Sequence, residues 1–262
     1  MKGHNSGRGN GKEAAPPAIL TLALILALAL LSLFAAFSAV AQPGQPDDLT
    51  VNDSSRRIES TTGFSVSAQA GNVSHLVIND TRVTAHWQGY YGRIAGVITL
   101  DDGKNNTLFD WQLANPVGEI FASNSSSVNW ANTTCVNLTN SASNGMTKVN
   151  ASIIEDTFNM SHTDADGVNE TFNYTFTDSF TVGERLIDSS KNCPLVYLYV
   201  NNAPQQADFK EVLLTDNTSV IFTALLENDL PGFDGSPWDF QLIVPENQAP
   251  GTTDFYFFVE LS

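Results

Sequence analysis

Three histidines and an excess of acidic residues are the side chains of this sequence that could support acid–base or metal chemistry. His75, His86 and His162 are scattered through its polar part. The first two would face each other if residues 73–79 and 83–87 paired as a hairpin. Even then, the sequence places no carboxylate or cysteine beside the pair of His75 and His86, as a metal site would need. We therefore predict no metal centre from these histidines.

Residues 162–170 resemble an ion-binding loop more closely than any other stretch. Asp164, Asp166 and Gly167 match the middle of a calcium loop, where oxygen ligands alternate and a glycine occupies the sharp turn. His162 stands where that loop needs an aspartate, and Asn173 stands where it needs a bidentate glutamate. The pattern is more typical of a plain acidic loop. Calcium at Asp164 and Asp166 is kept as an alternative, and no other cofactor is predicted.

Motifs of known catalytic sites do not occur in the sequence. Gly-x-Ser-x-Gly, Ser-x-x-Lys, His-Glu-x-x-His and phosphate-binding glycine loops are all missing. Asp110 and Glu119 could serve as the two carboxylates of a glycoside hydrolase. With 27 acidic residues from Gln42 onward, however, some such pair is expected by chance. We predict that the protein is not an enzyme.

Charge is distributed unevenly along the 262 residues. The chain has 28 acidic and 12 basic residues, a net charge of −16, and from Gln42 onward 27 acids and 9 bases give −18. This charge repels the phosphates of nucleic acids and the headgroups of anionic lipids. Nucleic acid is therefore excluded as a partner, and membrane contact is expected only through the N-terminal segment. Hydrophobic residues make up 42% of the chain, which suffices for a folded core.

The N-terminal segment is a candidate for targeting. Residues 18–41 carry no charge and are rich in leucine and alanine, and three basic residues precede them. The run is long enough to span a bilayer, and it ends in Ala39-Val40-Ala41, which suits a signal peptidase. Residues 1–41 are predicted to be a hydrophobic helix that serves as a signal peptide or an N-terminal signal anchor. A pilin-type leader is a third interpretation. We expect the remainder to be secreted or held at the extracellular face of the cell membrane.

Glycosylation sequons support export. Twelve Asn-x-Ser/Thr sequons follow the apolar run, and none precedes it. Their number is well above chance placement, so asparagine-linked glycans are predicted on the exported part. The candidate sites are Asn52, Asn72, Asn79, Asn105, Asn124, Asn132, Asn137, Asn150, Asn159, Asn169, Asn173 and Asn217.

Cys135 and Cys193 are the only two cysteines, and both lie in the exported part. An isolated pair in an oxidising compartment predicts a disulfide. A metal site would need further ligands at short spacing, and the sequence provides none. Two free thiols are the alternative.

Short runs rich in β-branched and aromatic residues predict about a dozen strands. Turn signals occur at residues 101–106 and 234–237. A helical spacing of apolar residues predicts one short helix at residues 146–158. We expect an all-β fold, an antiparallel β-sandwich of the jelly-roll or immunoglobulin-like kind, over residues 51–262, after a flexible linker at residues 42–50. The predicted strands are residues 63–69, 73–79, 83–87, 93–100, 108–114, 119–123, 171–178, 195–201, 211–216, 220–226, 238–244 and 254–261.

Aromatic residues alternate with polar ones in several of these runs. They are expected either to anchor the core or to form a platform on which sugar rings stack. The candidates for such a carbohydrate-binding platform are Trp87, Tyr90, Tyr91, Trp111 and Trp238.

Three motifs resemble a group of uncharacterised secreted or cell-surface archaeal proteins. They are W-x-G-x-x-G from Trp87, D-W-x-L-x-N-P-x-G-E from Asp110 and D-F-Q-x-I-V-P-E from Asp239. The resemblance covers most of residues 71–261, and it implies an envelope role and carries no catalytic residues. We expect a non-catalytic, N-glycosylated structural or interaction protein of an archaeal envelope, whose partners are other envelope proteins or its own copies. The alternative is a carbohydrate-binding or adhesion module with glycans as its partners.

Overall fold

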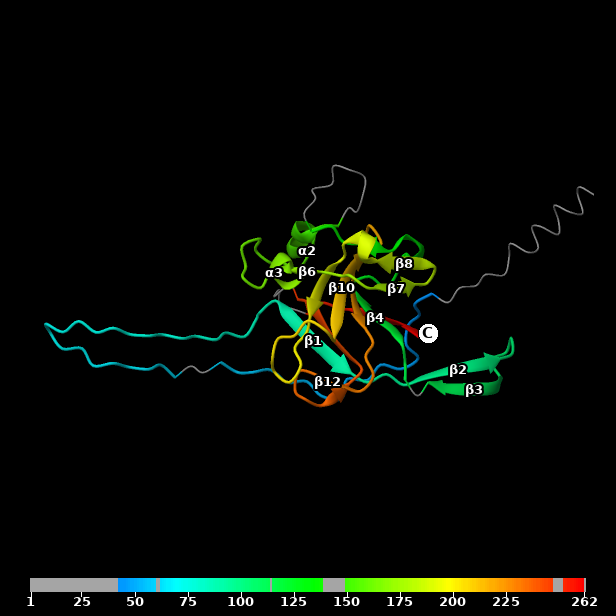
Figure 1. Cartoon of the computed structure of the whole chain (residues 1–262), viewed down its shortest axis with the longest axis horizontal. Helices are drawn as coiled ribbons and strands as arrows, with labels where there is room; N and C mark the ends of the chain where they lie inside the picture. The colour runs from blue at the N-terminus through cyan, green and yellow to red at the C-terminus, as the bar shows by residue number, and fades with distance from the viewer. Residues whose placement is uncertain (1–41, 60–61, 114, 139–148, 247–251, 262) are drawn as a thin grey trace, which may run out of the picture. The chain divides into compact units, whose positions relative to one another are not determined.

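A computed structural model describes residues 42–59, 62–113, 115–138, 149–246 and 252–261, coloured along the chain in Figure 1. The predicted N-terminal helix lies outside the described residues, as do residues 146–148 of the predicted short helix. Within the described ranges, no helix is long and apolar enough to cross a membrane.

Antiparallel strands dominate the described residues, which confirms the all-β prediction at the level of strand content and pairing. The largest sheet has seven strands: β4 (Gly118–Ser123), β5 (Thr134–Cys135), β6 (Tyr174–Thr175), β9 (Pro194–Tyr197), β10 (Lys210–Thr215), β11 (Val220–Leu225) and β15 (Tyr256–Leu261). Their order is β15-β4-β11-β10-β9-β6, with β5 also paired to β10.

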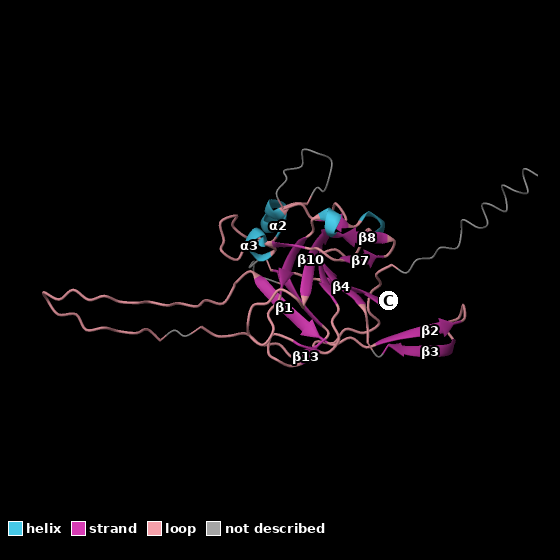
Figure 2. Ribbon diagram, viewed as in Figure 1, coloured by secondary structure: helices cyan, strands magenta, loops and turns pink. Residues whose placement is uncertain are grey.

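Smaller elements complete the fold (Figure 2). The two-stranded pairs are β1 (Trp87–Gly92) with β14 (Phe240–Pro245), β2 (Gly96–Asp101) with β3 (Thr107–Leu113), β7 (Ser179–Val182) with β8 (Arg185–Asp188), and β12 (Leu230–Pro231) with β13 (Pro237–Trp238). The helical pieces are α2 (Ala151–Thr157), α3 (Val168–Thr171) and the 3-10 turns η1 (Trp130–Asn132) and η2 (Ser189–Lys191). Both predicted turns are confirmed, since they join β2 to β3 and β12 to β13.

Both faces of the central sheet are buried, because successive side chains of β10 and β11 point to opposite faces and ten of these twelve residues are buried. On one face Leu213 and Phe222 pack with residues of α2, α3 and β14. On the other, Leu214 and Ile221 pack with residues of the β7–β8 pair and with the cysteines. Strands buried on both faces tend to have uninterrupted apolar runs. Residues 212–214 and 220–222 are such runs, and both strands were predicted from them.

The short helix forms where it was predicted, but it begins later. Asn150 precedes α2, and its side-chain oxygen accepts a hydrogen bond of 2.9 Å from the Ile153 amide, which caps the helix. Ile154 and Phe158 are buried in the core as the apolar spacing predicted, whereas Ile153 is exposed.

Several predicted strands are wrong. Residues 63–69 and 73–79 form no strand, and of residues 83–87 only Trp87 enters one. Residues 171–178 begin in α3 and contribute only the two-residue β6. The first two runs have strand-like composition, but within the described residues they lie along no sheet edge to which their backbone could bond.

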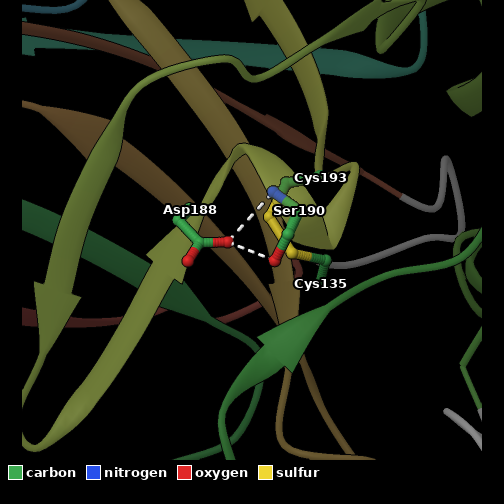
Figure 3. The surroundings of a disulfide bond; sticks show 4 residues. All are labelled: Cys135, Asp188, Ser190 and Cys193. Carbon is green, nitrogen blue, oxygen red and sulfur yellow. Dashed lines mark hydrogen bonds between the residues drawn. A yellow bond between two sulfur atoms is a disulfide. The ribbon is translucent and has the colours of Figure 1, made fainter.

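The predicted disulfide is confirmed. Cys135 of β5 and Cys193, just before β9, are bonded, and both are buried. Figure 3 shows how the neighbouring turn is fixed: the Asp188 carboxylate accepts hydrogen bonds from the amide and hydroxyl of Ser190 at the start of η2. These bonds lower the pKa of Asp188. The capped turn therefore leads the chain directly to Cys193.

Candidate functional site: an apolar hairpin and an unpaired segment

The β2–β3 hairpin is formed by two alternating runs and a turn that the sequence specifies closely. In that turn the Asp102 carboxylate accepts hydrogen bonds from the amides of Lys104 and Asn106, at 2.8 and 2.9 Å. Asn105 adopts a positive φ of 63°, which asparagine tolerates better than most residues. Hydrogen bonds from Asn106, and then from Lys104, lower the pKa of Asp102. The hairpin is thus held by its own turn.

One face of this hairpin is entirely apolar. Opposed residues of antiparallel strands share a face, and the register pairs Ile98 with Trp111 and Leu100 with Phe109. These four side chains are 48%, 50%, 49% and 57% exposed, in that order. The rings of Phe109 and Trp111 meet edge to face, with centroids 4.9 Å apart. We call these four residues the apolar hairpin face.

The opposite face of the hairpin is mostly polar. It carries Val97, Thr99, Asp110 and Gln112, which pair across the strands as Val97 with Gln112 and Thr99 with Asp110. Every residue from Val97 to Gln112 is exposed, so neither face is covered within the described part of the chain. An isolated two-stranded hairpin is at best marginally stable in water. The apolar hairpin face is therefore a candidate binding surface.

The second unusual feature is the segment before β1. All described residues between 47 and 82 are exposed and none belongs to a strand. Large apolar residues are included: Phe64 and Val73 are fully exposed, and Ile58 is 91% exposed. The backbone bond from the Asn72 amide to the Gln69 carbonyl closes a turn in the middle of the segment. We call residues 47–82 the unpaired segment because none of those described is paired in a strand, although side chains such as that of Arg57 bond across it.

Both ends of the unpaired segment are fixed to the folded part. At its start, Gly44 and Val259 of β15 exchange two backbone hydrogen bonds of 3.0 and 2.8 Å. At its end, His86 lies 3.1 Å from the Asp164 carboxylate, and the Trp87 indole donates to the Asp166 carbonyl at 2.6 Å. The exposed residues between these ends are therefore a loop of the domain and not a free tail.

The two aspartates of the acidic loop are each bonded to other groups of the protein. Asp164 accepts a hydrogen bond from the Ser161 amide and pairs with His86, and Asp166 accepts one from the Thr84 hydroxyl. The carboxylates of Asp164 and Asp166 therefore contact different groups of the protein. Nowhere in the described ranges do three or more histidine, cysteine or acidic side chains gather as a metal would need.

Other pairings suggested by the sequence do not form. His86 contacts the acidic loop, and the hairpin that would have placed it opposite His75 is missing from the described residues. Asp110 lies on the exposed hairpin, while Glu119 of β4 is paired in register with Glu260 of β15. Asp110 and Glu119 are therefore not a pair of facing carboxylates.

The five candidate aromatic residues are divided among three places. Trp87 and Tyr90 pack against the core, beside Phe172 and Phe257. Trp111 lies on the apolar hairpin face. Tyr91 and Trp238 form a small surface cluster with Phe233, in which Tyr91 meets each of the other rings at 64° and a centroid distance of 4.9 Å. These residues do not make one flat platform.

The burial of two glutamates was not predicted from the sequence. Burial, and then the charge of Glu260, raise the pKa of Glu119 to about 8. Burial raises the pKa of Glu260 as well, although both of its carboxylate oxygens accept from the single Gly183 N–H, which favours the charged form. Glu211 of β10 is fully buried, which raises its pKa well above the ordinary value, although the Ile243 amide donates to it. The only signal in the sequence was an acid within an apolar run.

The sequon asparagines are all accessible at least in part. Nine are exposed, and Asn137, Asn150 and Asn217 are half-buried. None is in the core, and the nine exposed asparagines are open to solvent.

No family model, curated protein or solved structure matches this chain.

Proposed function

We propose that this protein is an exported, N-glycosylated structural or interaction protein of an archaeal cell envelope and has no catalytic role. The apolar hairpin face is the observation that carries the proposal. Four large apolar side chains on a two-stranded element, each about half exposed, are typical of a surface that another molecule covers. The unpaired segment adds further exposed apolar residues.

Export is supported by three independent features. The sequon asparagines are accessible, the two cysteines are bonded, and the part after residue 41 has a charge of −18. Glycans and negative charge would keep such a domain hydrated outside the cell. The first 41 residues would act as the signal peptide or the membrane anchor.

For the fold we propose a β-sandwich of the jelly-roll or immunoglobulin-like kind. The β1–β14 pair supports it, because Leu242 and Val244 of β14 pack on the central sheet beside Leu213 and Phe222. Two antiparallel sheets that share one apolar layer are the basis of a sandwich.

Mass spectrometry of the intact protein from its native cells tests the proposed function. We expect a mass that exceeds the sequence mass of the mature chain by several glycans, and glycopeptides containing exposed sequons such as Asn52 and Asn124. Protease treatment of whole cells should release peptides of residues 47–82. An unmodified chain that is protected from protease in intact cells would reject the proposal.

A carbohydrate-binding module is the second candidate, and the surface cluster favours it. Tyr91 and Phe233 are 45% and 41% exposed, and the Arg93 guanidinium lies 5.7 Å from the centre of the Trp238 ring. If sugars bind there, Tyr91→Ala should weaken binding to envelope glycans by roughly tenfold, because a stacked ring is lost. Trp111→Ala, on the hairpin, is the control and should bind normally. Equal binding by both variants and the wild type would exclude the cluster.

A further inference from the structure

We propose that the apolar hairpin face binds the same face of a second copy of this chain. The inference rests on the proposed function as an interaction protein and identifies both the surface and the partner. Ile98, Leu100, Phe109 and Trp111 of one copy would pack on the same four residues of the other across a twofold axis.

The apolar hairpin face can pack on its own copy. Two alternating strands present one apolar face, and apolar sheet faces pack on one another about 10 Å apart. Two stacked hairpins make a four-stranded, two-layer unit with an apolar interior. A lone hairpin is at best marginally stable, because its apolar face has nothing to pack against. In the stacked unit, each hairpin supplies the packing partner of the other. One contact therefore stabilises the hairpins of both copies at once.

The positions of the charges are compatible with this contact. The hairpin carries Asp101 and Asp102 in its turn region and Asp110 on the opposite face, so the apolar hairpin face itself is uncharged. An antiparallel twofold arrangement places the two acidic turns at opposite ends of the contact. Like charges then stay apart although the protein as a whole is acidic.

The same charges argue against a lipid surface as the occupant. Elements that lie in a membrane interface combine an apolar face with lysine and arginine on the polar side. This hairpin carries three aspartates and a single lysine, Lys104. Anionic headgroups would repel it.

The exposed area of the apolar hairpin face indicates a weak contact, one that forms where many copies are close together. Four side chains that are each about half exposed offer about 400 Å² per copy, or about 800 Å² for a pair. A stable pair in solution usually buries at least about 1,200 Å². Copies held together on one cell surface would compensate through a high local concentration. We therefore expect a dissociation constant for the free protein that is roughly micromolar or weaker.

Disulfide trapping tests this geometry on the full chain in detergent. The two natural cysteines are bonded to each other, so an introduced cysteine is the only free thiol. Ile98→Cys and Leu100→Cys place it on the apolar hairpin face, and Val97→Cys and Thr99→Cys place it on the opposite face of the same strand. We expect at least tenfold more covalent dimer from the first pair. Equal yields from both pairs, or no dimer from any variant, would overturn the proposal.

A second measurement separates lost contact from lost hairpin structure. Ile98→Ser should raise the dissociation constant of the pair about thirtyfold in sedimentation equilibrium, because a twofold contact loses the side chain from both copies. Val97→Ser is matched in exposure, 51% against 48%, and should leave the constant unchanged. Equal effects of the two substitutions would contradict the proposal, as would trapping of a different protein in place of a second copy. Failure here would leave the proposed export and glycosylation intact, since intact mass tests those separately.

Discussion

The double substitution Cys135→Ala/Cys193→Ala is expected to lower the free energy of unfolding by about 4 kcal/mol. The bond joins residues 58 apart, and a cross-link of this span restricts the unfolded chain by an amount of that order. The bond also connects β5 to the start of β9, which are both neighbours of β10 in the central sheet. Chemical denaturation at pH 5 with and without reductant measures the effect.

The reductant provides the control. Wild-type protein in reductant should approach the stability of the double variant, and the variant itself should be insensitive to reductant. The alanine variant also loses two buried sulfur atoms, which the reduced wild type keeps, so reduced wild type should be slightly more stable than the variant. A loss below 1 kcal/mol would show that the bond does not stabilise the fold.

Glu119→Gln is expected to raise the free energy of unfolding by about 3 kcal/mol at pH 7 and to have almost no effect at pH 4. The pKa of Glu119 is about 8 in the folded protein, against 4.5 for an ordinary glutamate. Below pH 4.5 the carboxyl is protonated in both the folded and the unfolded chain. Between pH 4.5 and 8 only the unfolded chain releases the proton, and each pH unit then lowers stability by about 1.4 kcal/mol.

Denaturation curves at half-unit steps from pH 4 to 8.5 would measure this slope. The wild type should lose stability as the pH rises, and Glu119→Gln should flatten the curve. Glu211 contributes in the same direction, because its pKa is also raised by burial. Glu184→Gln is the control, since Glu184 is exposed and close to Gly183 in sequence. A wild-type curve that rises from pH 5 to pH 8 would refute the assignment.

How far the sequence predicts the fold depends on how each strand is stabilised. β10 and β11 each contain a short apolar run, residues 212–214 and 220–222, that is buried on both faces, and these runs identify the strands. The hairpin turn was equally clear from Asp102, Asn105 and Asn106, because its hydrogen bonds are local. Residues 63–69 and 73–79 have the same strand-like composition, yet form no strand. Composition indicates which residues can form a strand. Whether they do depends on a neighbouring strand with free backbone groups.

The candidate site was predictable only in part. Trp111 was singled out from its motif, but its partners Ile98, Leu100 and Phe109 became visible only through the strand register. Glu119 was noted with the wrong partner for the same reason: its true neighbour, Glu260, is 141 positions further along the chain. Gly118, next to it, adopts a φ of 142°, and a side chain there would collide with the backbone of Glu260. That close approach explains a glycine that composition alone left unexplained.

The paired backbone of Gly44 and Val259 has a mechanical consequence for a protein tethered by its N-terminus. Tension on the tether would act first on two hydrogen bonds, which can open one after the other. Once the side-chain bonds at Val83, Thr84 and His86 had also opened, the 42 residues between Gly44 and Trp87 would extend to as much as about 140 Å before the load reached β1. The central sheet and the disulfide would come under load only after the segment before β1 was fully extended. The exposed loop would thus lengthen under tension before the central sheet had to unfold.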